Sequence, residues 1–141
     1  MRIYVASSWR NEYQQAVVAD LREAGHEVYD FRNPRPGRGG FHWSEIDPRW
    51  QGWSPELFVQ ALGHPIAQAG FEQDFTAMRE AEACVLVLPC GRSAHLEAGF
   101  MKGSGKPTYV LHPPDSMEPE LMYLLADEVF TDIRPLLKVL Q

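Results

Sequence analysis

The stretch ACVLVLP (residues 83–89) decides the fold class, because it is a continuous apolar run with polar residues on both sides. Such a run is typical of a central strand of a parallel sheet, which is buried on both faces. The next residues, CGRSAHLEAGFMK (90–102), form a glycine-bearing loop and then a predicted helix from about Ala94 to Lys102. A strand that leads through a loop into a helix is the repeating unit of α/β folds.

The same alternation extends in both directions along the chain. RIYVA (2–6) and HEVYDF (26–31) predict strands, and the apolar spacing of residues 11–24 predicts a helix that Gly25 ends. The sequence therefore predicts an α/β sandwich with a mostly parallel sheet of about five strands. The remaining predicted elements are strands at TYVLH (108–112) and EVF (128–130), a helix near Glu118 to Leu125 and a final helix.

Residues 33–53 break this pattern, because they are rich in Pro, Gly and Trp and have no apolar period. Loops of this length are usually functional lids or disordered, and the aromatic residues argue against disorder. Those aromatic residues either fill a satellite core beneath the loop or contact a ligand. Two predicted helices follow. The first, residues 54–62, begins with Ser54 as its cap, and the second, about 65–82, has Gly70 as a point where it could break.

Length and composition describe one soluble domain. The chain of 141 residues is long enough for one core and too short for two, and 45% of its residues are hydrophobic. No apolar run approaches the roughly 20 residues that cross a bilayer, so we expect no membrane contact. The opening residues, MRIYVASSW, predict a first strand and no signal peptide, which makes a cytoplasmic location the expectation. Cys84 and Cys90 are then expected to be reduced.

Charge and motif spacing exclude several classes of partner. The net charge of −6 argues against binding to polymeric nucleic acid, although Arg32, Arg35 and Arg38 lie close together. The histidines have no paired spacing that would hold a metal, and no dinucleotide-binding or phosphate-loop motif is present, so we expect neither a metal nor a cofactor. The five histidines are His26, His42, His64, His95 and His112.

Polar segments follow four of the predicted strands. Ligands of parallel sheets bind beyond the carboxyl ends of the strands, where the strand order reverses. We therefore expect these segments to converge on one cleft, with Tyr4 on the first strand reaching toward a carboxylate of the third loop and its helix. The segments are SSWRN (7–11), DFRNP (30–34), CGRSAHLE (90–97) and HPPD (112–115).

Three segments carry a family resemblance: IYVASSWRNEYQ (3–14), FEQDFTAMREAEACVLVL (71–88) and HLEAGFMKGSGKPTYVL (95–111). In this order they resemble the nucleoside 2-deoxyribosyltransferase family and its relatives, the N-glycosidases that hydrolyse nucleoside monophosphates. The resemblance implies a flavodoxin-like three-layer sandwich and a single domain over residues 1–141, with an inserted aromatic and arginine-rich loop at about 32–64. It also implies that the protein is an enzyme acting on a nucleotide or nucleoside.

The resemblance implies roles for three residues. Glu97 would attack the anomeric carbon, since a carboxylate stabilises an oxocarbenium-like transition state and can bond to the sugar. A helix start would keep Glu97 ionised and the Tyr4 hydroxyl would orient it. Asp74 matches an aspartate that contacts the base. The alternatives are a helix-start carboxylate for Glu97 and a solvated or capping residue for Asp74.

The loop before Glu97 departs from the family pattern. Transferases of the family usually carry an acidic residue there, whereas this chain has Gly91, Arg92, Ser93 and His95, which favours an anion site. Ser7 and Ser8 could instead cap a helix, Arg92 could be a surface residue, and His95 could contact either Glu97 or a phosphate. The residues that match phosphate contacts of the monophosphate-hydrolysing relatives are Ser7, Ser8, Arg10 and Ser93.

The family resemblance also bears on base binding and on oligomeric assembly. The resemblance implies a homodimer or a larger oligomer, in which Met122 or Glu120 reaches the site of a neighbour; alternatively, the apolar residues around Met122 form core at helical spacing. Hydrolysis is favoured slightly over transfer, and NAD cleavage or non-catalytic nucleotide binding are the rival functions. The residues expected to line or enclose the base and sugar are Trp9, Asp30, Phe31, Phe41 and Trp43.

Overall fold

The computed structural model of the chain describes residues 1–35, 37–115 and 117–141. The chain divides into two units, of which the first comprises Met1–Asp30 and Glu80–Gln141 and the second comprises Phe31–Arg79. The first unit contains the whole sheet, and the second contains the segment that interrupts the strand and helix alternation. In the described ranges, no helix combines the length and the apolar character needed to cross a membrane.

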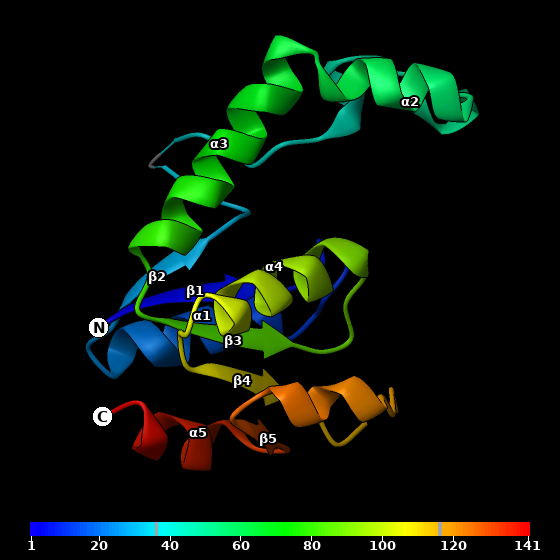
Figure 1. The fold of residues 1–141 in the computed structure, drawn as a ribbon. Coiled ribbons are helices and arrows are strands. Elements are labelled where there is room, and N and C mark those ends of the chain that lie inside the picture. Colours follow the sequence, from blue (N-terminus) through cyan, green and yellow to red (C-terminus); the bar gives the residue numbers. More distant parts are fainter. Residues whose placement is uncertain (36, 116) are drawn as a thin grey trace. The chain divides into compact units, whose positions relative to one another are not determined.

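Five parallel strands form the sheet of the first unit in the order β2-β1-β3-β4-β5 (Figure 1). The prediction of a mostly parallel five-stranded sheet is confirmed. The apolar run from residue 83 supplies the central strand, which is buried along its whole length. The strands are β1 (Arg2–Ala6), β2 (Glu27–Asp30), β3 (Ala83–Val87), β4 (Thr108–Leu111) and β5 (Glu128–Phe130).

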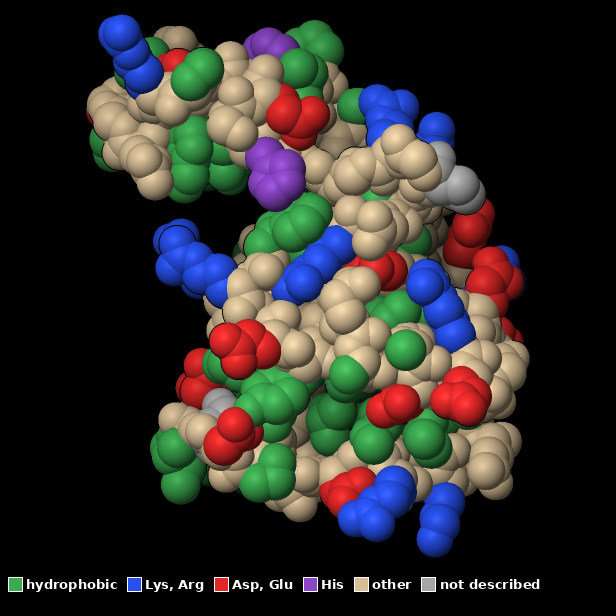
Figure 2. Space-filling view, turned by 180° about the vertical axis from the view of Figure 1, so that it is seen from behind, with side chains coloured by type: hydrophobic (Ala, Val, Ile, Leu, Met, Phe, Trp, Pro, Cys, Tyr) green, Lys and Arg blue, Asp and Glu red, His purple; other side chains and the backbone are tan. Residues whose placement is uncertain are grey.

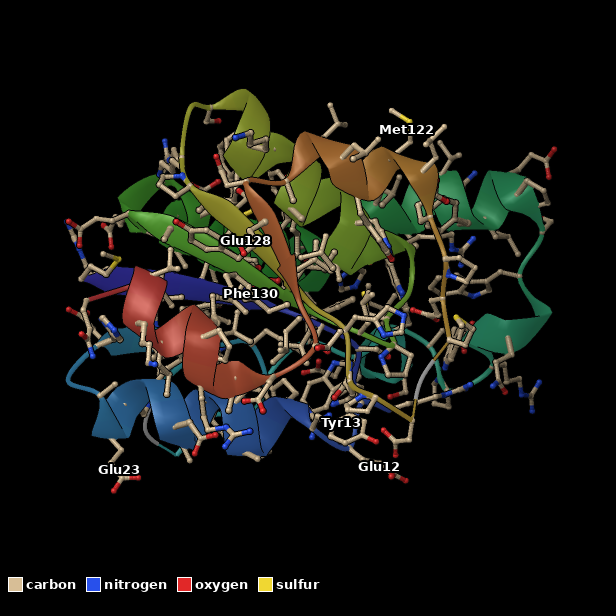
Figure 3. All side chains as sticks on the ribbon, turned by 90° about the horizontal axis from the view of Figure 1, so that it is seen from below. Glu12, Tyr13, Glu23, Met122, Glu128 and Phe130 are labelled. Carbon is tan, nitrogen blue, oxygen red and sulfur yellow. The ribbon has the colours of Figure 1, made fainter. Side chains whose placement is uncertain are left out.

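Helices cover both faces of this sheet. Side chains alternate between the faces along each strand, so Ile3 and Val5 point to one face and Tyr4 to the other. The Ile3 face packs against α1 (Gln14–Glu23) and α5 (Ile133–Val139), which Figure 3 shows on the same side of the strands. The opposite face carries α4 (Arg92–Gly103). The three layers expected from the sequence are therefore present.

The helix ends differ from the predicted ones for local reasons. Helix α1 begins at Gln14 and not at Asn11, because the Asn11 side chain accepts hydrogen bonds from the first backbone N–H groups. Gly25 follows the helix with a φ of 93°, a conformation that suits glycine, so its predicted role as the stop is confirmed. Helix α4 begins at Arg92, two residues earlier than expected.

The helix predicted near Glu118 to Leu125 is wrong in type and length. Only a 3₁₀ helix, η3 (Leu121–Leu125), forms there, and Glu120 caps it by accepting from the Met122 N–H. Short helices depend on packing of an apolar face for stability, and the side chain of Leu124 is 82% exposed. The alternative in which these apolar residues form core is therefore also wrong within this chain.

The second unit holds two helices and an aromatic cluster. Ser54 accepts from the Leu57 N–H at 3.2 Å, which confirms it as the cap of α2 (Pro55–Leu62). Helix α3 (Pro65–Glu80) has no break at Gly70, where an added Cβ would lie 3.0 Å from the Cβ of Phe41. Glycine there allows a close approach of the loop. Two 3₁₀ turns, η1 (Trp43–Glu45) and η2 (Trp50–Gly52), precede α2.

Candidate functional site

The candidate site lies at the carboxyl edge of the sheet, between β1 and β3. These neighbouring strands run parallel, and the chain leaves them toward opposite faces, into α1 and α4 respectively. Such a reversal is the position where open α/β sheets bind ligands. Hydrogen bonds described below connect the segments after β1 and β3, so the structure brings together two of the four polar segments that the sequence singled out.

Glu97 lies on the sheet-facing side of α4. The buried residues Ala94, Ala98 and Met101 define that side, and Glu97 follows Ala94 by three positions and precedes Met101 by four. Residues at such spacings share a helix face. The neighbouring Leu96 points the other way and is 76% exposed. Glu97 itself is half-buried.

The strand residues beneath α4 form the surroundings of this carboxylate. Tyr4 and Cys84 are partners in the register of β1 and β3, and both are fully buried. Burial raises the pKa of the Cys84 thiol, and the negative charge of Glu97 raises it further. The Tyr4 ring stacks on Tyr29 with 5.3 Å between centroids, which fixes its orientation. Tyr4 therefore belongs to the face on which Glu97 lies.

One expectation about Glu97 needs correction. The sequence predicts a helix start near Ala94, which would place the carboxylate in the first turn. Because α4 begins at Arg92, Glu97 is in the second turn, and no acidic residue occupies the first. The favourable field of a helix start decays within about one turn, so this field contributes less to Glu97 than the sequence implied.

A buried asparagine that was not among the predicted site residues connects the two strand ends. Asn11 is 3% exposed, and its Nδ2 donates to the Val87 carbonyl at 3.2 Å and to the Pro89 carbonyl at 2.9 Å. Ser7 Oγ also donates to Val87 O, at 2.9 Å. A hydroxyl has one hydrogen, so in this arrangement Ser7 can accept from a ligand but not donate to it. The position of Asn11 between a strand and a helix was the signal available in the sequence.

The segments after β2 and β4 reach the same edge through α1. The buried Asp30 carboxylate accepts from Gln14 Nε2 at 2.9 Å and from Gln15 Nε2 at 3.1 Å. A hydrogen bond with the Asp115 carboxylate raises the pKa of Tyr13, which lies just before α1 (Figure 3). Asp30 from the segment after β2 and Asp115 from the segment after β4 therefore both contact residues at the start of α1, in the first unit.

His95 uses both ring nitrogens inside the chain. Its Nδ1 lies 2.7 Å from the Gly91 carbonyl oxygen, which can only accept, so Nδ1 carries the hydrogen. In the neutral ring, Nε2 then accepts from the Tyr123 hydroxyl at 2.9 Å. Burial, followed by the charges of Cys90, Glu118 and Glu120, raises the pKa of Tyr123 to about 12, which keeps that donor protonated.

Exposed cations flank the same strand ends. Arg10 follows β1 and Arg92 begins α4; both are exposed, and neither forms a salt bridge with another described residue. Ser93, also exposed, is the second residue of α4. In the lower part of Figure 2, which shows the first unit, Lys and Arg side chains of the described residues stand apart with carboxylates among them. The local arrangement suits a small anion better than a polymer.

Other predicted site residues have different surroundings. Trp9 is exposed in the loop after β1, and the Met122 side chain on η3 is 58% exposed and points away from the sheet (Figure 3). Asp74 and Phe31 are half-buried in the second unit. Phe41 packs edge-on against Trp43 at 4.8 Å, and Trp43 also contacts Trp53 and Phe58, as expected of a satellite core.

Among the described residues, no group of three or more His, Cys, Asp and Glu side chains could hold a metal ion.

We expect the thiols of Cys84 and Cys90 to react slowly with alkylating reagents. Both are free, Cys84 is buried, and burial with the charges of Glu118 and Glu97 raises the pKa of Cys90 to about 12. At pH 8 the thiolate fraction of Cys90 is then on the order of 10⁻⁴. We expect iodoacetamide to label Cys90 far more slowly than glutathione and Cys84 only after unfolding, as measured by peptide mass spectrometry. Rapid labelling of Cys90 at pH 8 would contradict this arrangement.

The fold is similar to two solved structures over nearly the whole chain. A 2-deoxyribosyltransferase from the psychrotolerant bacterium Bacillus psychrosaccharolyticus has a TM-score of 0.66 and 20% sequence identity, with 96% of this chain and 90% of that chain covered. A CMP N-glycosidase of Clostridium botulinum has a TM-score of 0.51 and 16% identity, with 99% and 97% covered. No protein-family model and no curated protein sequence matches the chain. At these identities the likeness establishes the shared fold, an α/β flavodoxin-like fold as the family resemblance implied.

Proposed function

We propose that this chain is an enzyme that cleaves the N-glycosidic bond of a nucleotide or nucleoside, with Glu97 as the nucleophile. The observation that carries the proposal is the placement of a half-buried carboxylate on α4, over the buried Tyr4 and beside the switch point of the sheet. The fold is also shared with a 2-deoxyribosyltransferase and a CMP N-glycosidase. The activities of these two enzymes support N-glycosyl chemistry as the reaction class.

The reaction would proceed in two displacements. A Glu97 oxygen bonds to the anomeric carbon while the bond to the base nitrogen breaks, and the base leaves with the electron pair. A proton or hydrogen bond to the base ring stabilises this leaving group, and the family resemblance implies that Asp74 has this role. Water then adds to the anomeric carbon and loses a proton, which releases the sugar and regenerates the carboxylate. The Tyr4 hydroxyl orients Glu97.

A 5′-phosphate on the sugar fits the charges at the strand ends. Arg10 and Arg92 form no salt bridge with the residues that the structure describes, and Ser8 and Ser93 add hydroxyls near them in sequence. Charge-assisted hydrogen bonds of this kind favour a nucleotide over a free nucleoside. Within this proposal, Gly91 lets the loop approach the substrate, while Ser7 and His95 hold the loops through Val87 and Tyr123. The sequence-based assignment of Trp9, Asp30, Phe31, Phe41 and Trp43 to base binding stays a prediction.

The deciding experiment measures release of free base. The purified protein is incubated with nucleoside monophosphates, the matching ribo- and deoxynucleosides, and NAD, and the products are separated by liquid chromatography. We expect base release from at least one monophosphate, with sugar phosphate as the second product. Adding a second free base tests for transfer, which would yield a new nucleotide. Binding without release would instead indicate a non-catalytic nucleotide-binding protein, and release of nicotinamide alone would indicate NAD cleavage.

We further propose that the chain forms a homo-oligomer, as the family resemblance implies, and that it acts in the cytoplasm. On η3, Leu121, Leu124 and Leu125 are mostly exposed, and exposed apolar side chains favour association. We expect sedimentation velocity to show a dimer or larger species, and Leu124→Glu to shift it toward monomer by at least tenfold in dissociation constant. A monomeric wild-type protein at micromolar concentration would contradict this.

A further inference from the structure

We propose that Asn11 is a positioning residue that holds the loop before α4, and thereby Glu97, in the geometry needed for base release. The inference rests on the proposed function for its catalytic consequence and on the hydrogen bonds of Asn11 for its mechanism. Asn11 is far from Glu97 in the sequence and precedes α1, whereas Glu97 lies on α4. It acts through the backbone that joins β3 to α4.

The Asn11 side chain connects three segments at once. Its Oδ1 accepts from the N–H groups of Tyr13 and Gln14 at 2.7 and 2.8 Å, which caps α1. Its Nδ2 donates to the carbonyls of Val87 and Pro89. Val87 is the last residue of β3, and Pro89 stands three residues before α4 begins.

These partners dictate the orientation of the amide. Two carbonyl oxygens on one side can only accept, and two backbone N–H groups on the other can only donate. The amide therefore has one assignment, in which both of its N–H groups are used on the loop. A carboxylate could keep the α1 cap but would set negative oxygens against two carbonyl oxygens. Aspartate and asparagine, although equal in size, are not interchangeable at this position.

After Pro89, the contacts of this loop among the described residues converge on His95. Pro89 has no backbone N–H to donate, and the next two residues toward α4 contact the His95 ring, Cys90 through its sulfur at 3.7 Å and Gly91 through its carbonyl oxygen at 2.7 Å. Asn11 thus holds one end of the loop from α1, and His95 holds the other from α4 and η3. Because α4 begins right after this loop, a shift of Pro89 moves the start of the helix and the position of Glu97 relative to Tyr4. Displacements of about 1 Å from a productive geometry can cost roughly 100-fold in rate.

The test is the pair Asn11→Asp and Asn11→Ser. Asn11→Asp keeps the α1 cap and loses both donors to the loop, while Asn11→Ser keeps a shorter acceptor and introduces no charge. For each we expect kcat for base release to fall about 10- to 100-fold with KM changed less than about threefold, because substrate contacts remain. Circular dichroism and thermal unfolding check that the variants are folded.

A matched control replaces an aspartate by asparagine at the start of another helix, which is the reverse of Asn11→Asp. Asp132 caps α5 by accepting from the Arg134 N–H, and Asp132→Asn removes a carboxylate there without touching the loop. We expect this variant to lose stability and to retain the wild-type kcat. Folded Asn11 variants with the wild-type kcat would overturn the inference, and so would failure of both variants to fold, since Asn11 would then support the whole fold.

Hydrogen exchange separates this inference from the proposed function. In Asn11→Asp, amides of residues 90–97 should exchange at least tenfold faster than in the wild type, while those of α5 stay unchanged. A wild-type protein that releases no base refutes the proposed function, but the exchange result still decides whether Asn11 holds the loop. Unchanged exchange in residues 90–97 would refute the positioning role even in an active enzyme.

Discussion

Glu97→Gln is expected to lower the rate of base release by about 10³- to 10⁵-fold, which is the usual cost of removing a nucleophile. The amide is nearly the same size as the carboxylate and keeps the packing of α4 over Tyr4 and Cys84. It lacks the negative charge that stabilises the oxocarbenium-like transition state and cannot form the glycosyl ester. Single-turnover and steady-state assays on the best monophosphate of the panel measure the loss.

The control for this prediction is Glu23→Gln. Glu23 points into solvent at the end of α1 (Figure 3), so the same chemical change there should leave kcat within about twofold. Mass spectrometry of acid-quenched wild-type reactions should also show a sugar-phosphate adduct on the peptide that contains Glu97. A Glu97→Gln protein with nearly the wild-type rate would refute the assignment of Glu97 as the nucleophile, although the proposed activity would remain.

The double variant Arg10→Ala with Arg92→Ala is expected to lose the preference for a phosphorylated substrate. Charge-assisted hydrogen bonds to a phosphate contribute about 1.5–3 kcal/mol each when shielded from water, and less at exposed sites. We therefore expect kcat/KM for the monophosphate to fall about 10- to 100-fold, while kcat/KM for the matching nucleoside changes less than about threefold. The ratio of the two constants is the measured quantity.

An exposed arginine outside the site serves as control for the double variant. Arg134 pairs with Asp132 beside α5, and Arg134→Ala should leave the ratio unchanged. Raising the ionic strength should weaken the preference of the wild type but not that of the double variant. If both substrates lose activity equally, the two arginines support the fold or the base and not a phosphate.

The regular elements could be predicted because each carries its own pattern. The buried strand at residues 83–87 has no polar interruption, and Ser54 before Pro55 marks a helix start; both agree with the structure. The helix prediction for the segment around Met122 was wrong because most of this segment lacks a packing partner among the described residues. Its apolar spacing is helical, but a spacing does not say whether a surface exists for it to pack on, and most of these side chains are exposed.

The sequence by itself determined the α/β alternation, the parallel sheet and the segments that meet at its carboxyl edge, because periodicity and turn residues act over short stretches of chain. It also marked Glu97 by its small and apolar neighbours. Only the tertiary structure decided that α4 starts at Arg92 and presents Glu97 over Tyr4, and that Asn11 donates to Val87 and Pro89. Those hydrogen bonds join residues more than seventy positions apart, and the pattern within one segment does not contain the partner that another segment brings to it.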